Sequence, residues 1–189
     1  MTDAQTTLQI SADFDSGNIR VVDASDSRHV RLAIRPDTQS DHFQWFHFKV
    51  SGLVPGTTHG FHLENAGQSS YPTAWAGYHA VASYDQRTWF RVPSRFEAGA
   101  LSFDFEAREP QAWFAYFEPY SRERHAQLIE RAQNQAGMQL LALGKSIEGR
   151  NIELLRKGSG TDPALLSTSR YAELRRFIFW ADASSPLAW

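Results

Sequence analysis

Up to Phe117 the chain repeats one pattern, in which short runs carry apolar residues at every second position and are separated by turn residues. The two faces of the clearest run carry Phe46, Phe48 and Val50 on one side and Trp45, His47 and Lys49 on the other. Because side chains of a β-strand alternate between its two faces, this period of two predicts strands. About eight to ten such strands, with no helical period between them, predict an antiparallel β-sandwich or barrel.

The turns between these runs are marked by glycine, proline, aspartate and asparagine. Leu8–Phe14 leads through Asp15–Asn18 into Ile19–Val22, which predicts a β-hairpin with a glycine available for a positive φ. Val30, Leu32 and Ile34 form the next run, which ends at Pro36 because the ring nitrogen of proline cannot donate to the strand ladder. The remaining expected strands include Phe61–Leu63, His79–Tyr84, Trp89–Val92, Leu101–Phe105 and Trp113–Phe117.

The segment 65–78 is the least regular part of this region and is rich in glycine, serine, proline and aromatic residues. Loops of this kind on a rigid sheet often carry binding contacts. Trp75 and Tyr78 are therefore candidates either for contact with a ligand or for packing against another domain.

A single amphipathic helix follows the strand region. Pro119 biases the residue before it away from helical conformation, and Ser121 is a good N-cap for a helix that Gly137 can end in a left-handed conformation. The apolar face of this helix carries Leu128, Ile129, Ala132 and Ala136. We therefore predict one domain over residues 1–118 and the start of a second over 119–189.

The second region contains little regular pattern beyond this helix. Leu140–Leu143 and Ile152–Leu154 predict two strands joined by a tight connection, and Tyr171–Phe179 fits a short helix or a strand. A segment with one helix and one hairpin is too small to enclose a core of its own. We expect it to depend on the sandwich or on further polypeptide.

Composition excludes several classes of function. The formal net charge of −2 gives no field able to hold a polyanion, so we expect no nucleic acid partner. The chain has no cysteine, which excludes disulfides and zinc–thiolate sites. The first ten residues lack the features of a secretory signal and no run reaches membrane-spanning length, so we expect no membrane partner and a cytoplasmic location.

Six phrases of the sequence resemble, in the same order, the amino-terminal half of bacterial proteins of the cytosolic carboxypeptidase family. The phrases are FDSGNI (14–19), QWFHFKV (44–50), AWAGYHAVASYD (74–85), WFRVPS (89–94), AYFEPYSRERH (115–125) and LGKSIEGRNIELL (143–155). Members of this family are zinc metallocarboxypeptidases, and the resemblance covers about residues 8 to 158.

The resemblance implies a β-sandwich attached to an α/β carboxypeptidase domain, whose first hairpin the last phrase resembles. In the family the next element carries a His-Pro-Gly-Glu phrase that supplies two zinc ligands, but here the sequence RRFIFWADASSPLAW (175–189) stands in its place. We therefore expect the second domain to be truncated before the zinc motif. The resemblance implies that the intact enzyme uses zinc to hydrolyse C-terminal peptide bonds, with those next to acidic residues as one option. We expect this chain alone to hold no cofactor.

We find no substitute site in the remaining residues. No histidine begins a His-x-x-Glu phrase, and the densest group, His59, His62 and Glu64, lies on an expected strand where the two histidines point to opposite faces. The positions of His42 and His47 differ by an odd number, which puts the two side chains on opposite faces, and both are interpreted as structural. His125 is interpreted as a surface or domain-contact residue. We predict no catalytic and no metal-binding residue in this chain.

These observations leave two main hypotheses for function. The first is an accessory or folding domain of a zinc metallocarboxypeptidase, with the missing catalytic domain as its partner and peptide or protein C-termini as the substrate of the parent enzyme. Trp75, Tyr78, Tyr120 and Arg122 are then candidates for the domain interface or for ligand contact, and we prefer domain packing for the two loop aromatics. The second is a stand-alone module whose loop Tyr71–Tyr78 binds a peptide or a carbohydrate. An independent enzyme with an unrecognised site is a third, less favoured possibility.

Overall fold

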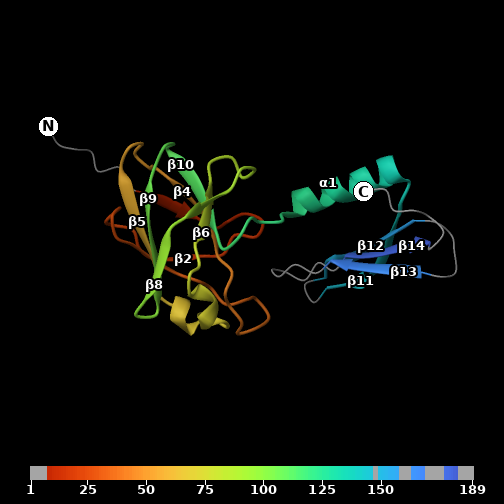
Figure 1. Cartoon of the computed structure of the whole chain (residues 1–189), viewed down its shortest axis with the longest axis horizontal. Coiled ribbons are helices and arrows are strands. Elements are labelled where there is room, and N and C mark those ends of the chain that lie inside the picture. Colours follow the sequence, from red (N-terminus) through yellow and green to blue (C-terminus); the bar gives the residue numbers. More distant parts are fainter. Residues whose placement is uncertain (1–7, 147–148, 158–162, 169–176, 183–189) are drawn as a thin grey trace. The chain divides into compact units, whose positions relative to one another are not determined.

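The computed structural model describes residues 8–146, 149–157, 163–168 and 177–182 (Figure 1). The chain divides into two compact units, Met1–Pro119 and Tyr120–Trp189. We describe each unit by itself and call them the sandwich unit and the C-terminal unit. No helix in the described residues is long and apolar enough to cross a membrane.

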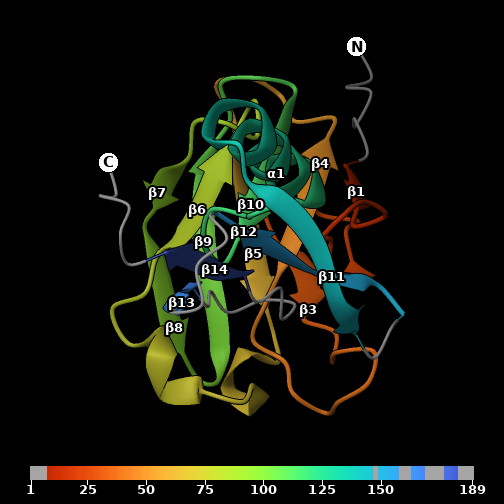
Figure 2. The same cartoon turned by 90° about the vertical axis from the view of Figure 1, so that its right-hand side faces the viewer.

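The sandwich unit consists of two five-stranded sheets, which confirms the predicted mainly β sandwich (Figure 2). The first sheet has the order β1 (Gln9–Ser11), β4 (His47–Ser51), β10 (Gln111–Ala115), β6 (Ala80–Ser83) and β7 (Phe90–Val92). The second has the order β2 (Arg20–Asp23), β3 (Val30–Ala33), β5 (Thr58–Leu63), β9 (Ala100–Glu106) and β8 (Ser94–Glu97). Neighbouring strands are antiparallel except β3 and β5, which run parallel. Two short 3-10 helices, η1 (Ala66–Gln68) and η2 (Pro72–Trp75), lie in the irregular loop.

Phenylalanine rings from both sheets form the centre of the sandwich core. Phe114 of β10 stacks on Phe48 of β4 with 5.3 Å between ring centroids and meets Phe61 of β5 at 5.0 Å. Phe61 in turn stacks on Phe103 of β9 at 5.3 Å. Since aromatic rings bury large apolar areas and prefer such offset or tilted contacts, these side chains join the two sheets. The alternation of the sequence thus directs the apolar face of each strand into this layer.

The predicted hairpin between Leu8 and Val22 is wrong, because β1 and β2 belong to different sheets. Asn18 forms an isolated bridge to His47 of β4, with its N–H donating to the His47 carbonyl at 2.8 Å. The turn is thereby held against the first sheet, and the chain then crosses to the second. Ser16, at φ 65°, takes the left-handed conformation that we expected of a glycine. Gly17 is needed for another reason, since a Cβ there would lie 2.1 Å from the Ala12 carbonyl oxygen.

The predicted helix is confirmed as α1 (Arg122–Ala136) in the C-terminal unit. The Ser121 hydroxyl accepts a hydrogen bond from the Arg124 N–H, and Gly137 follows the helix in the left-handed conformation at φ 61°. Ile129 is buried against Leu155, with three half-buried neighbours, Leu128, Ala132 and Met138. This small cluster is the apolar core among the described residues of the unit.

Helix α1 runs along one side of a four-stranded mixed sheet (Figure 1). The sheet has the order β11 (Gln139–Lys145), β12 (Asn151–Arg156), β14 (Phe177–Asp182) and β13 (Pro163–Thr168). The hairpin β11–β12 is the one expected from the sequence, and the parallel pairing of β12 with β14 was not predicted. Of the segment that fitted either a helix or a strand, Phe177–Phe179 lies in β14, and 171–176 lie outside the described residues.

Candidate functional site

A cluster of aromatic rings around one buried histidine covers part of the outer face of the first sheet. We call it the His47 cluster and define it by Phe14, Ser16, Trp45, His47 and Trp89. His47 points away from the sandwich core, as predicted from the alternation, yet its side chain is only 2% exposed. The reason is a cover of rings, with centroid distances from His47 of 4.8 Å to Phe14, 6.0 Å to Trp45 and 5.9 Å to Trp89.

The hydrogen bonds of Ser16 indicate which ring nitrogen of neutral His47 carries the proton. The Ser16 hydroxyl donates to the Asp15 carbonyl at 2.5 Å, so at 3.0 Å from His47 Nδ1 it can only accept. The proton of the neutral imidazole therefore sits on Nδ1 and leaves Nε2 as an acceptor. Both His47 Nε2 and the Trp89 indole nitrogen are buried without a hydrogen-bond partner. Burial lowers the pKa of His47 to about 4, so the imidazole is neutral near pH 7.

Asn18 fixes the turn that supplies Ser16 to this cluster. Its amide nitrogen donates to the carbonyls of Arg35 at 3.0 Å and Trp45 at 2.9 Å. Its amide oxygen accepts from Nε of Arg35 at 3.1 Å. The Trp45 indole N–H donates to the Ser16 carbonyl at 2.7 Å. Residues of three phrases that carry the family resemblance, FDSGNI, QWFHFKV and WFRVPS, therefore meet around one histidine.

This arrangement favours a structural role over catalysis. An imidazole that is 2% exposed and covered by rings is poorly placed to reach a substrate, and the Ser16 hydroxyl beside it already donates to the backbone. The sequence analysis placed His47 on the outer face but did not predict its burial. The spacing of two between Trp45 and His47 indicates that these side chains share one strand face. The contacts with Phe14 and Trp89 depend on distant parts of the chain and have no local signal.

The structure places Trp75 and Tyr78 in the packing of the irregular loop. Trp75 is 1% exposed, and its indole N–H lies 2.8 Å from the Ala66 carbonyl and 2.9 Å from the Ser69 hydroxyl. The Tyr78 hydroxyl donates to the Tyr116 carbonyl at 2.5 Å, and burial raises the pKa of Tyr78 above its usual range. Their rings contact each other edge to face at 5.1 Å.

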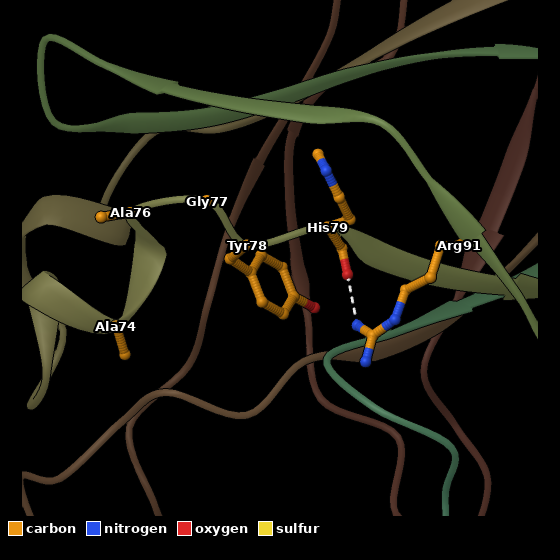
Figure 3. Close-up of a pocket in the computed structure, with 6 residues that line it drawn as sticks. All are labelled: Ala74, Ala76, Gly77, Tyr78, His79 and Arg91. Carbon is orange, nitrogen blue, oxygen red and sulfur yellow. Dashed lines mark hydrogen bonds between the residues drawn. The ribbon is translucent and has the colours of Figure 1, made fainter.

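A shallow depression of about 370 Å³ borders this loop and is lined by Ala74, Ala76, Gly77, Tyr78, His79 and Arg91 (Figure 3). Arg91 donates to the His79 carbonyl at 2.6 Å, while the His79 ring points away from the guanidinium (Figure 3). The Ser94 N–H donates to His79 Nδ1, so neutral His79 carries its proton on Nε2. The depression presents one cation and mostly backbone and small side chains, which define no chemistry beyond a weak attraction for an anion.

Tyr120 and Arg122 lie at the beginning of the C-terminal unit, and both are exposed. The Tyr120 ring stands edge to face against His125 at 6.2 Å, and the Arg124 guanidinium lies 6.0 Å from the same ring. His125, which we interpreted as a surface or domain-contact residue, is buried within this unit, and its Nε2 lies 2.6 Å from Glu153 of β12. That contact joins α1 to the sheet.

The histidines do not form the zinc site that the family resemblance implies for an intact enzyme. His59 and His62 lie on opposite faces of β5, as predicted, with His59 buried and accepting from the Val54 N–H at 3.3 Å. Glu64 pairs with Arg31. Within the part of the chain that the structure describes, no group of three histidine, aspartate or glutamate side chains is placed to hold a metal ion. The residues described do not fit a zinc ion.

Two facing five-stranded sheets joined by packed phenylalanine rings define the first unit as a β-sandwich domain. The chain belongs to the family described as the cytosolic carboxypeptidase N-terminal domain, whose model matches residues 10–117. The match covers nearly all of the sandwich unit.

Solved structures of related proteins extend the similarity into the C-terminal unit. A metallo-carboxypeptidase from Pseudomonas aeruginosa, solved with (2-guanidinoethylmercapto)succinic acid, is 57% identical over 87% of this chain, with a TM-score of 0.74. A metallo-carboxypeptidase from Burkholderia cenocepacia is 39% identical over 79% of this chain, with a TM-score of 0.75. Among curated proteins, cytosolic carboxypeptidase 1 of Mus musculus is 26% identical over 68% of this chain.

This chain matches only part of each relative. It covers 41% of the Pseudomonas chain, 39% of the Burkholderia chain and 13% of the mouse protein. An uncharacterized protein of Zymomonas mobilis, 42% identical over 82% of this chain, is covered to 40% of its length. The relatives therefore include a large region that has no counterpart in this sequence.

Proposed function

We propose that this chain is the accessory N-terminal portion of a cytosolic-type zinc metallocarboxypeptidase and that its sandwich serves the folding of the catalytic domain. The observation that carries this proposal is the family match over residues 10–117, which corresponds to the sandwich. The similarity to two bacterial metallo-carboxypeptidases over more than three quarters of this chain supports it.

The same proposal holds that the chain alone does not hydrolyse peptides. The sequence contains no His-x-x-Glu phrase, and the described histidines are used in packing or in hydrogen bonds to neighbouring groups. The parent enzyme would cleave C-terminal peptide bonds in the cytoplasm, with acidic residues next to the cleaved bond as one preference to test. The zinc and its ligands would come from polypeptide that this chain does not contain.

The partner of the sandwich would be a catalytic carboxypeptidase domain. We place the functional boundary between Glu118 and Pro119, in the segment that connects strand β10, which ends at Ala115, to helix α1, which begins at Arg122. Tyr120 and Arg122, both exposed, are proposed to contact the remainder of that catalytic domain. For Trp75 and Tyr78 we propose an indirect role, in which their buried side chains hold the loop in shape for such contacts.

A separate function as a peptide- or carbohydrate-binding module receives less support. A binding platform needs an exposed aromatic face, whereas the indole of Trp75 is enclosed and hydrogen-bonded on its polar edge. Tyr71 is the most exposed aromatic residue of the loop, at 59%, and one exposed ring does not define a sugar site.

A chimaera tests the accessory role. Residues 1–157 of this chain would replace the corresponding region of the Pseudomonas aeruginosa metallo-carboxypeptidase, and the catalytic remainder without any N-terminal portion would serve as the control. We expect the chimaera to be produced as folded protein with carboxypeptidase activity and the control to be poorly folded. An accessory role would be contradicted if the control is itself folded and active. It would also be contradicted if the chimaera folds but shows no more carboxypeptidase activity than the control.

A further inference from the structure

Two histidine rings lie against each other on the outer face of the second sheet. His62 of β5 stands between Phe61 and Leu63, which are both fully buried, so its side chain points away from the sandwich core. His29 directly precedes β3, and its ring is tilted against that of His62 with 4.1 Å between the ring centroids. Each of the other five histidines has a ring nitrogen within hydrogen-bond distance of a neighbouring group. Among the described residues these two rings have no such bond.

The backbone around Gly60 holds this pair in place. The segment before β3 crosses directly over β5, where the Gly60 N–H donates to the Ser27 carbonyl at 3.2 Å. A Cβ at Gly60 would lie only 2.2 Å from the Arg28 carbonyl oxygen, so this close crossing requires glycine. In the parallel register of β3 with β5, His29 comes beside this glycine, which has no side chain, and its ring leans over the strand onto His62. Backbone contacts thus bring the two rings together.

Carboxylates lie near His62 on the same face. Asp104 of β9 and Glu64 are both close enough to act electrostatically on its ring. Asp104 pairs with Arg95 at 3.4 Å and Glu64 pairs with Arg31, so the positive charges of these arginines are compensated. Within the described residues no third histidine, aspartate or glutamate is placed to complete a three-ligand set. An ion held here would therefore have two protein ligands.

We propose that His29 and His62 together bind one copper(II) ion, each through one ring nitrogen, with water molecules at the remaining positions. Imidazole is a ligand for copper, nickel and zinc, and at a given nitrogen site copper(II) binds more tightly than the other two. Zinc sites in proteins take three or four protein ligands, which this pair does not supply. Copper(II) accepts a tetragonal set of nitrogen and oxygen donors, which two imidazoles and water provide.

The spacing of the rings is close to what such an ion needs. Two imidazoles at adjacent corners of a tetragonal ion, each bound at about 2 Å, have ring centroids roughly 4.5 Å apart. The observed 4.1 Å requires only a small opening of the pair, and the exposed His29 can turn its ring to bring a nitrogen to the ion. No local spacing joins the two histidines, so the sequence alone predicted no metal-binding residue here.

Isothermal titration of the purified full chain with copper(II), in a buffer that does not chelate the metal, tests the site. His29→Gln and His62→Gln should each raise the dissociation constant of the tightest copper site at least about tenfold. The double variant should lose no more than either single variant, because the two ligands act as a unit. His42→Gln, which changes another exposed histidine of the sandwich unit, is the matched control and should bind copper as the natural chain does. Circular dichroism checks that all variants remain folded.

Electron paramagnetic resonance of the copper-loaded chain reports the ligands themselves. We expect nitrogen couplings from two imidazoles in the natural chain and in His42→Gln, and from fewer in His29→Gln and His62→Gln. Copper binding that is equally weakened in His42→Gln, or that is unchanged in the two site variants, would show that copper binds surface histidines without a defined site. Either result, or couplings from a single imidazole in the natural chain, would overturn the proposal. This inference does not depend on the carboxypeptidase assignment.

Discussion

Replacement of His47 by glutamine should reduce the loss of unfolding free energy that this protein suffers as the pH falls from 7 to 5. Glutamine keeps one donor and one acceptor for the cluster but does not titrate. In the native chain His47 is buried and neutral, and burial lowers its pKa to about 4. The unfolded chain has no such burial, and a histidine there has a pKa of about 6.5.

The sign and size of the effect follow from proton linkage. Below pH 6.5 the unfolded chain binds a proton at His47 that the folded chain does not, so the free energy of unfolding falls as the pH falls. The stabilisation is fully present above about pH 6.5, is lost progressively below it and is gone at about pH 4. Between pH 7 and pH 5 these two pKa values correspond to a loss of about 2 kcal/mol.

Urea unfolding followed by tryptophan fluorescence at pH 7 and pH 5 measures this loss. The natural chain should lose about 2 kcal/mol more than His47→Gln over this interval. Other titrating groups, including His59 and His62, whose pKa values are also lowered by burial, contribute equally to both proteins and cancel in the comparison. Equal losses in the two proteins would show that His47 is not held neutral, and the account of the cluster would be wrong.

Three further substitutions test the packing of the sandwich, each by urea unfolding. Trp75→Phe should lower the free energy of unfolding by about 2–4 kcal/mol, because two buried acceptors lose their donor, and a change under about 1 kcal/mol would contradict this. Asn18→Ala should cost about 2 kcal/mol, since one amide joins the carbonyls of two separate segments, and an unchanged midpoint would argue against that role. Gly60→Ala should cost about 3 kcal/mol because its methyl would lie 2.2 Å from the Arg28 carbonyl oxygen. At the control position Gly56, a Cβ would have no atom within 4 Å, so Gly56→Ala should cost only about 1–2 kcal/mol, from the strain of a left-handed backbone. Equal losses of unfolding free energy in Gly60→Ala and Gly56→Ala would show that the close contact at Gly60 does not matter.

The parts of the fold that could be predicted depend on local sequence. The face assignment of Phe46, Phe48 and Val50 needs only the two-residue period of a strand, and all three are buried. The helix bounds need only the capping serine, Ser121, and the terminal glycine, Gly137, and both act as expected. Local patterns of this kind determine which side of an element is apolar, and burial follows from it.

The parts that could not be predicted depend on contacts between distant segments. The Asp15–Asn18 turn has the residues of a hairpin, but its bond to His47 diverts the chain into the other sheet. The parallel pairing of β12 with β14 joins residues more than twenty positions apart, and no local period encodes it. The burial of His47 likewise requires Phe14 and Trp89, which the sequence places far on either side of it.

The central claim, that this chain is the accessory portion of a metallocarboxypeptidase without chemistry of its own, is tested most directly by one measurement on the purified full chain. Bound zinc would be quantified by mass spectrometry of the metal content, and hydrolysis of a glutamate-tailed peptide would be followed in the same samples. The account predicts substoichiometric zinc and no cleavage above a blank. One zinc per chain together with cleavage would contradict it and would require a metal site that the residues described here do not form.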